Sequence, residues 1–96
     1  MREVPDQIIS LVKDRQVLLS AKARHQLDTG AFDTDDLIHS VLYGQVVKKE
    51  RDERTVSRYK YTIVGPSCSG DSIYSCGKII NLLEKAYFII TFHETR

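Results

Sequence analysis

The segment Tyr87-Phe88-Ile89-Ile90-Thr91-Phe92 restricts the fold more than any other part of this sequence. It consists only of aromatic and β-branched residues, which favour extended backbone. It is also apolar at successive positions rather than at alternate ones. We therefore expect the strand Ala86–His93 to lie inside a sheet and to be covered on both faces.

Three more strands are expected upstream, in the second half of the chain. The segment Ser57–Val64 has the period of two that is typical of strands. Its two faces are Tyr59, Tyr61 and Ile63, and Arg58, Lys60 and Thr62. Turn-rich residues 65–71 precede a strand predicted over 72–80, and a further turn follows over 81–85. Val46-Val47 begins the remaining strand, which enters the mixed charge run 48–54, typical of a solvated hairpin tip.

The first half of the chain has helical periodicity. Apolar residues after Pro5 recur at helical spacing and predict a helix over 5–15. Ser20 is a good N-cap for a second helix ending near Gly30. Asp33 and Asp36 have the spacing of a capping box and begin a third helix, which ends at Gly44. We therefore predict an α+β fold, with N-terminal helices packed on one face of a three- to four-stranded antiparallel sheet.

Composition limits the cellular setting and the kinds of partner. The chain has 96 residues, enough for a single domain over 1–96, and a formal net charge of +1. This charge argues against non-specific nucleic-acid binding by bulk electrostatics, although a local basic face remains compatible with it. Neither a membrane-spanning run nor a secretion signal is present, so we expect a cytoplasmic protein without a membrane partner. A reducing compartment would keep Cys68 and Cys76 as thiols.

The sequence lacks the usual metal and nucleotide motifs. Its cysteines and histidines do not have the close paired spacing of a zinc site. The Ser- and Cys-rich turn over 65–71 has no Gly-Lys-Ser/Thr and precedes a strand rather than a helix, unlike a phosphate-binding loop. We therefore expect no metal, no nucleotide cofactor and no other cofactor.

Groups suited to metal-independent cleavage of RNA are present. Such cleavage needs a base for the 2′-hydroxyl, an acid for the leaving oxygen and cations around the phosphate. The candidate acid–base residues are His93, His25 and Lys60, and the candidate RNA contacts are Lys22, Arg24, Arg58 and Tyr61. Each also has a plain structural explanation, as a solvent-facing charge or a packed aromatic ring. His93 directly follows the predicted buried strand and so should be held rigidly.

Three stretches carry a resemblance to a known family. They are Ser20–Phe32, Asp36-Leu37 with Gly44 and Val46-Val47, and Ile89-Ile90-Thr91-Phe92-His93-Glu94. In these stretches the chain resembles the small bacterial uncharacterised domain family DUF 4258, over residues 18–94, with 1–17 as an additional N-terminal helix. That family is similar in layout to RelE- and MqsR-like toxins. The resemblance implies an mRNA endonuclease, ribosome-dependent or free, that is held by an antitoxin-type protein.

The chain departs from the family pattern at two informative places. Lys22 stands where the family has histidine, and Gly30-Ala31 stands where it has Arg-Gly. A lysine can hold a phosphate, but it is a poor general base at neutral pH. These differences favour an alternative function, a non-catalytic interaction module that binds an antitoxin-like partner or a second copy of itself.

Overall fold

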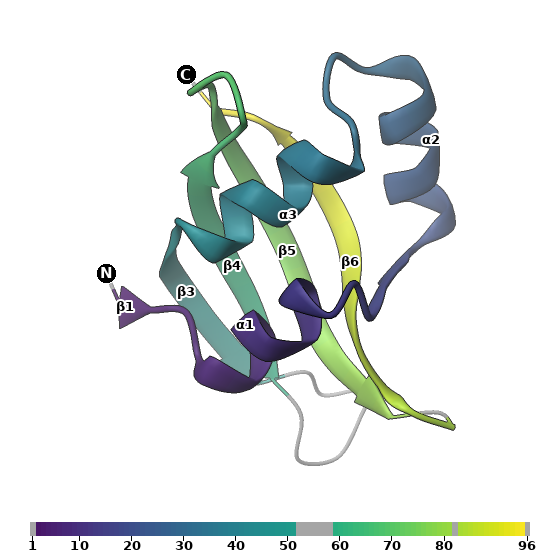
Figure 1. The fold of residues 1–96 in the computed structure, drawn as a ribbon, viewed down its shortest axis with the longest axis vertical. Coiled ribbons are helices and arrows are strands. Elements are labelled where there is room, and N and C mark those ends of the chain that lie inside the picture. Colours follow the sequence, from purple (N-terminus) through teal and green to yellow (C-terminus); the bar gives the residue numbers. More distant parts are fainter. Residues whose placement is uncertain (1, 52–58, 82, 96) are drawn as a thin grey trace.

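In the part of the chain that the structure describes, three helices pack against one six-stranded sheet (Figure 1). This computed structural model describes residues 2–51, 59–81 and 83–95. The helices are α1 (Asp6–Lys13), α2 (Ala21–Thr29) and α3 (Thr34–Leu42). The strands are β1 (Arg2–Glu3), β2 (Val17–Leu19), β3 (Gln45–Arg51), β4 (Tyr59–Pro66), β5 (Ser72–Asn81) and β6 (Lys85–Glu94).

The sheet is larger than the sequence predicted, and it is mixed. Its strand order is β1-β3-β4-β5-β6-β2, in which β2 runs parallel to β6 and the other pairs are antiparallel. The α+β class fits, but the prediction of three to four antiparallel strands is wrong. The two additional strands have two and three residues, which is too short for a period of two to be visible.

Local capping explains where the helices begin. The Ser20 hydroxyl accepts the N–H of Ala23 at 3.0 Å, so Ser20 is the N-cap of α2. Asp33 and Asp36 form the predicted capping box at the start of α3, each carboxylate accepting the other residue's N–H at 3.0 Å. α1 begins after Pro5, whose missing N–H costs nothing there.

The core lies between the helices and one face of the sheet. Its fully buried side chains include Ile8 and Val12 of α1, Leu37 and Val41 of α3, and Ile63, Ile73, Tyr87 and Ile89 of the sheet. α3 approaches β4 very closely at Gly65, where a Cβ would collide with the Ser40 carbonyl oxygen. Only glycine allows this approach, so the packing of helix on sheet depends on it.

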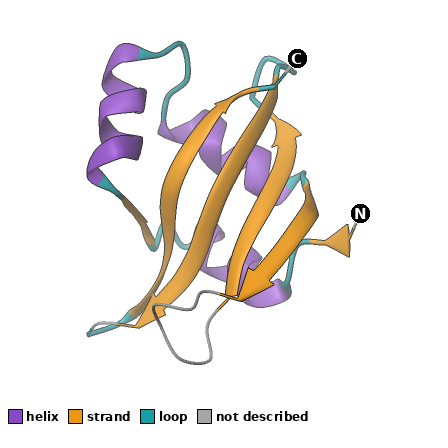
Figure 2. Cartoon of the chain, turned by 180° about the vertical axis from the view of Figure 1, so that it is seen from behind, coloured by secondary structure: helices purple, strands orange, loops and turns teal. Residues whose placement is uncertain are grey.

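The second face of the sheet has no helix over it in the described ranges (Figure 2). Along β6, Tyr87, Ile89 and Phe92 are buried, whereas Phe88 is half-buried. The prediction that this strand is covered on both faces is therefore wrong. The three described helices form a single layer on one face of the sheet (Figure 2).

The connections between strands also differ in detail from the prediction. Residues 48–51 of the charge run belong to β3 rather than to a hairpin tip, and 52–54 lie outside the described residues. β4 begins at Tyr59 and extends through Gly65 and Pro66, which were expected to lie in the turn. Proline is tolerated there because it closes the strand.

Candidate functional site

The three predicted acid–base residues do not converge. His25 is exposed on α2, Lys60 lies on β4, and His93 lies near the end of β6. The register places Lys60 beside Lys78 in one cross-strand row, whereas His93 lies in the row of Tyr74 and Val64. These rows are four residues apart along β4, which is about 13 Å. The register therefore does not place these two side chains next to each other, as a base and an acid on one phosphate would need to be.

His93 instead has a packing partner on the uncovered face. Its ring stacks on Tyr74, with ring centroids 4.8 Å apart and planes at 27°. The two residues are directly paired between β5 and β6. The His93 ring therefore lies beside an aromatic neighbour rather than beside a second acid–base group.

The predicted RNA contacts are divided between separate elements. Lys22 and Arg24 are exposed on α2, and Arg58 lies outside the described residues. Tyr61 is half-buried on β4, where it packs against the core. Of the candidates that the structure describes, Tyr61 and Lys60 lie beside the lysine-rich strand β3.

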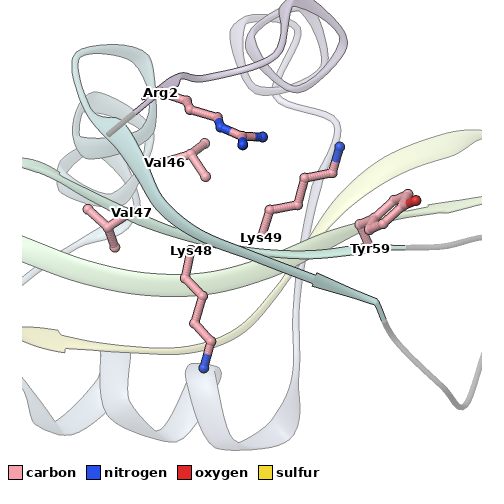
Figure 3. Close-up of a pocket in the computed structure, with 6 residues that line it drawn as sticks. All are labelled: Arg2, Val46, Val47, Lys48, Lys49 and Tyr59. Carbon is pink, nitrogen blue, oxygen red and sulfur yellow. The ribbon is translucent and has the colours of Figure 1, made fainter.

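The region around β3 includes a hollow at the free edge of this strand, which we call the β3 hollow (Figure 3). Its volume is about 400 Å³. The residues that line it are Arg2, Val46, Val47, Lys48, Lys49 and Tyr59. Arg2 and Lys49 extend into the same space beside the Tyr59 ring, whereas Lys48 leaves the strand on its other side.

Aromatic rings position the Lys49 ammonium group. Its Nζ atom lies 4.4 Å from the ring centroid of Tyr59 and 5.7 Å from that of Tyr61. Both distances are within the range of a cation–π interaction. No carboxylate lies within ion-pair distance of Lys49 or Arg2 among the described residues. Within the part of the chain that the structure describes, the charges of Lys49 and Arg2 are therefore not neutralised by an ion pair.

The local fold explains why this edge is open. β1 pairs with only Gln45 and Val46, so β3 has no neighbour on that side from Val47 onward among the described strands. A β-bulge between Val46 and Lys48 shifts the register and places Lys49 opposite Tyr61. Lysines on an edge strand also discourage edge-to-edge aggregation, so the charge has a structural role here as well.

Charge is separated along the sheet. Strands β3, β4 and β5 carry five cations, Lys48, Lys49, Arg51, Lys60 and Lys78, and one carboxylate, Glu50. All six lie toward the end of the sheet where β3 finishes and β4 begins. The acidic start of α3 lies near the opposite end, because Asp36 accepts the N–H of Cys68 at 3.0 Å in the turn after β4. The net charge of +1 conceals this separation.

Perturbed ionisation occurs away from the β3 hollow. The N–H groups of Asp33 and Cys68 hold the pKa of the Asp36 carboxyl below its usual range. Burial raises the pKa of the Cys76 thiol. The pKa of the Cys68 thiol is also raised, mainly by desolvation and to a smaller extent by the nearby Asp36 carboxylate. Both cysteines therefore stay protonated near neutral pH and are not activated nucleophiles. In residues 2–51, 59–81 and 83–95, no cluster of three His, Cys, Asp or Glu side chains could hold a metal ion.

Sequence reasoning missed the main residues of this hollow. Lys48 and Lys49 were assigned to a hairpin tip, although the preceding Val46-Val47 was a signal that the strand could continue into them. Arg2 carries no signal of its own, because only the pairing of β1 with β3 brings it here.

Comparisons with protein-family models, with curated proteins and with solved structures give no match for this chain. The resemblance to DUF 4258 and to RelE-like toxins stays a prediction. No helix in the described ranges is long and apolar enough to cross a membrane.

Proposed function

We propose that this protein binds single-stranded RNA at the β3 hollow and along the neighbouring basic strands. The observation that carries the proposal is the position of Lys49, whose Nζ lies 4.4 Å from the Tyr59 ring centroid while Arg2 extends into the same hollow. Cations beside aromatic rings suit RNA, because phosphates pair with the cations and unstacked bases stack on the rings.

Further cations lie at the same end of the sheet, on its opposite, uncovered face. Lys60 and Lys78 are directly paired across β4 and β5, and Lys48 lies nearby on β3. A strand of RNA bound in the β3 hollow would reach these cations by passing around the open edge of β3. RNA binding agrees with the toxin-like function that the family resemblance implies, in which the target is mRNA or the ribosome.

We propose RNA binding rather than cleavage by the three predicted acid–base residues. Cleavage requires a base and an acid on opposite sides of one phosphate. His25 on α2, and Lys60 and His93 in separate rows of the sheet, do not meet that requirement.

Fluorescence anisotropy with a labelled single-stranded RNA tests this proposal. We expect the double variant Arg2→Gln/Lys49→Gln to bind more weakly. The slope of log K against log salt should fall by about 0.7 for each phosphate that the variant no longer neutralises. Tyr59→Ala removes a stacking platform and should weaken binding by about 5- to 150-fold, equivalent to 1–3 kcal/mol.

The matched control is Lys22→Gln/Arg24→Gln, which removes two exposed cations from α2. It should leave the affinity almost unchanged. Equal losses of affinity in both double variants would show that binding depends only on overall charge and would contradict the proposed site. Growth arrest on expression that His93→Ala abolishes would contradict our exclusion of His93 from the chemistry.

A second candidate function, protein interaction, is favoured by a different feature. Strand β2 forms the opposite edge of the sheet and carries exposed Leu18. The partner that fits this edge is a second copy of the chain.

A further inference from the structure

The edge at β2 differs in character from the edge at β3. Its three residues, Val17, Leu18 and Leu19, are all apolar, and no further strand pairs with them among the described residues. The Leu18 side chain is 44% exposed, and nearby Leu83 is fully exposed. Both line a mainly apolar hollow of about 440 Å³ between β2 and the start of β6. An apolar, uncharged edge is the kind that accepts another strand.

The backbone of β2 has unused hydrogen-bonding groups on its outer side. The Gln16 carbonyl accepts the N–H of Tyr87 at 2.9 Å, and the Ser20 N–H donates to the Ile89 carbonyl at 3.0 Å. In a parallel pair, alternate residues of a strand bond to the same neighbour. Since Gln16 and Ser20 face β6, Leu18 does too, and the N–H and C=O groups of Val17 and Leu19 point away from the sheet.

We propose that this edge binds a second copy of the same chain, with the two β2 strands antiparallel across a twofold axis at Leu18. In this register Val17 of each copy lies opposite Leu19 of the other. These are the two residues with outward backbone groups, so each pair can exchange two hydrogen bonds. Leu18 then faces its own equivalent at a non-hydrogen-bonded position, where the Cα atoms are about 4.5 Å apart.

Charges around β2 favour the antiparallel arrangement. Lys22 and Arg24 follow the strand on α2. At the other end are Asp14 and Glu84, the latter accepting a hydrogen bond from the Gln16 side chain at 3.4 Å. Arg15 at this end is already paired with Asp35 at 2.7 Å, and Lys13 and Lys85 balance the two carboxylates, so this end is neutral. An antiparallel pair brings each basic end, with Lys22 and Arg24, against a neutral end, whereas a parallel pair would place the two basic ends together.

Such a dimer has one continuous sheet. The axis at Leu18 is perpendicular to the sheet, so both helical layers lie on the same side and both uncovered faces lie on the other. The two β3 hollows then lie at the far ends of the assembly, because β3 and β2 are on opposite sides of each subunit's sheet. Dimerisation therefore leaves the proposed RNA site open in both copies.

A cysteine at the axis provides a direct test. In a Cys68→Ser/Cys76→Ser background, Leu18→Cys should form an intermolecular disulfide under mild oxidation, because a Cα separation of about 4.5 Å lies within the range that a disulfide spans. Val47→Cys is the matched control, since Val47 is similarly exposed, at 41%, on the opposite edge. Cross-linking of Leu18→Cys that is no faster than that of Val47→Cys would overturn the proposed register.

The oligomeric state of the unmodified chain gives an independent measurement. Sedimentation velocity from micromolar to near-millimolar concentration should show a dimer, and Leu18→Lys should convert it to a monomer, while Val47→Lys should not. Circular dichroism would show that both variants are folded. A monomer at every concentration, or a dimer that persists in Leu18→Lys, would overturn the proposal, and neither result would affect RNA binding at the β3 hollow.

Discussion

Removal of the Tyr87 hydroxyl should stabilise this protein. The side chain is 0% exposed at the centre of the core, and its hydroxyl has no hydrogen-bond partner among the described residues. Burial raises the pKa of this hydroxyl well above its usual range, so it is neutral near physiological pH. On folding, this hydroxyl therefore gives up its hydrogen bonds to water and gains none from the described residues.

The size of the expected stabilisation follows from the cost of burying a hydroxyl without a hydrogen-bond partner. A buried polar group without a partner costs about 1–3 kcal/mol, whereas Tyr87→Phe keeps the ring and its packing. We expect the free energy of unfolding to rise by about 1 kcal/mol. For a domain of this size, that change raises Tm by roughly 4–8 °C.

Urea titration followed by circular dichroism measures the change. The midpoint should move to higher urea with an unchanged m-value, because the exposed area on unfolding stays the same. Tyr59→Phe is the control, since Tyr59 is 43% exposed, and it should alter stability by less than about 0.5 kcal/mol. A destabilisation of about 1 kcal/mol or more in Tyr87→Phe would show that the hydroxyl does have a hydrogen-bond partner, such as a buried water, and would contradict the expected stabilisation.

Three further changes test the packing and the caps, each by urea or thermal unfolding. Gly77→Ala should destabilise the protein by about 1–3 kcal/mol, because the added Cβ would lie 2.6 Å from the Tyr87 hydroxyl and ring. An unchanged free energy of unfolding would show that the Tyr87 ring can move aside. Ser20→Ala should lower the free energy of unfolding by about 1–2 kcal/mol, because the Ser20 hydroxyl both caps α2 and donates to the Ile90 carbonyl. A loss no larger than that of a helix cap alone would show that the hydrogen bond to Ile90 contributes little. Asp36→Asn should lower stability at neutral pH by about 1 kcal/mol or less. The lowered pKa of Asp36 in the folded state means that its stabilisation is present above the ordinary carboxyl range and is lost as pH falls through the folded value. Variant and parent should therefore converge in acid, and a gap that stays constant with pH would contradict this assignment.

The uncovered sheet face shows how far sequence reasoning reached in the candidate site. The alternation of Tyr59, Tyr61 and Ile63 with Lys60 and Thr62 was predicted, and the strand register agrees with it, but burial does not alternate, because Tyr59 is exposed and Thr62 is buried. The separation of Lys60 from His93 was not predictable, because it depends on how far β4, β5 and β6 slide past one another. The β-bulges in two of the strand pairs change that register by one residue each, and a short sequence contains no strong signal for them.

Features set by neighbouring residues were determined by the sequence alone. The Asp33–Asp36 capping box, the Ser20 cap and the long strands β4, β5 and β6 all arise from interactions within a few residues or from a visible period. The sequence therefore indicates where these elements begin and end, although their stability still depends on packing in the folded domain.

Only the tertiary structure decided the two edges of the sheet. The pairing of Val17 with Tyr87 and of Arg2 with Val46 joins segments far apart in the chain, and strands this short gain their stability from the neighbour rather than from their own residues. Those pairings place Arg2 beside Lys49 at one edge and leave Leu18 exposed at the other. The last strand, whose composition most restricted the fold, was predicted as a strand, but the single helical layer determined that only one of its faces is covered.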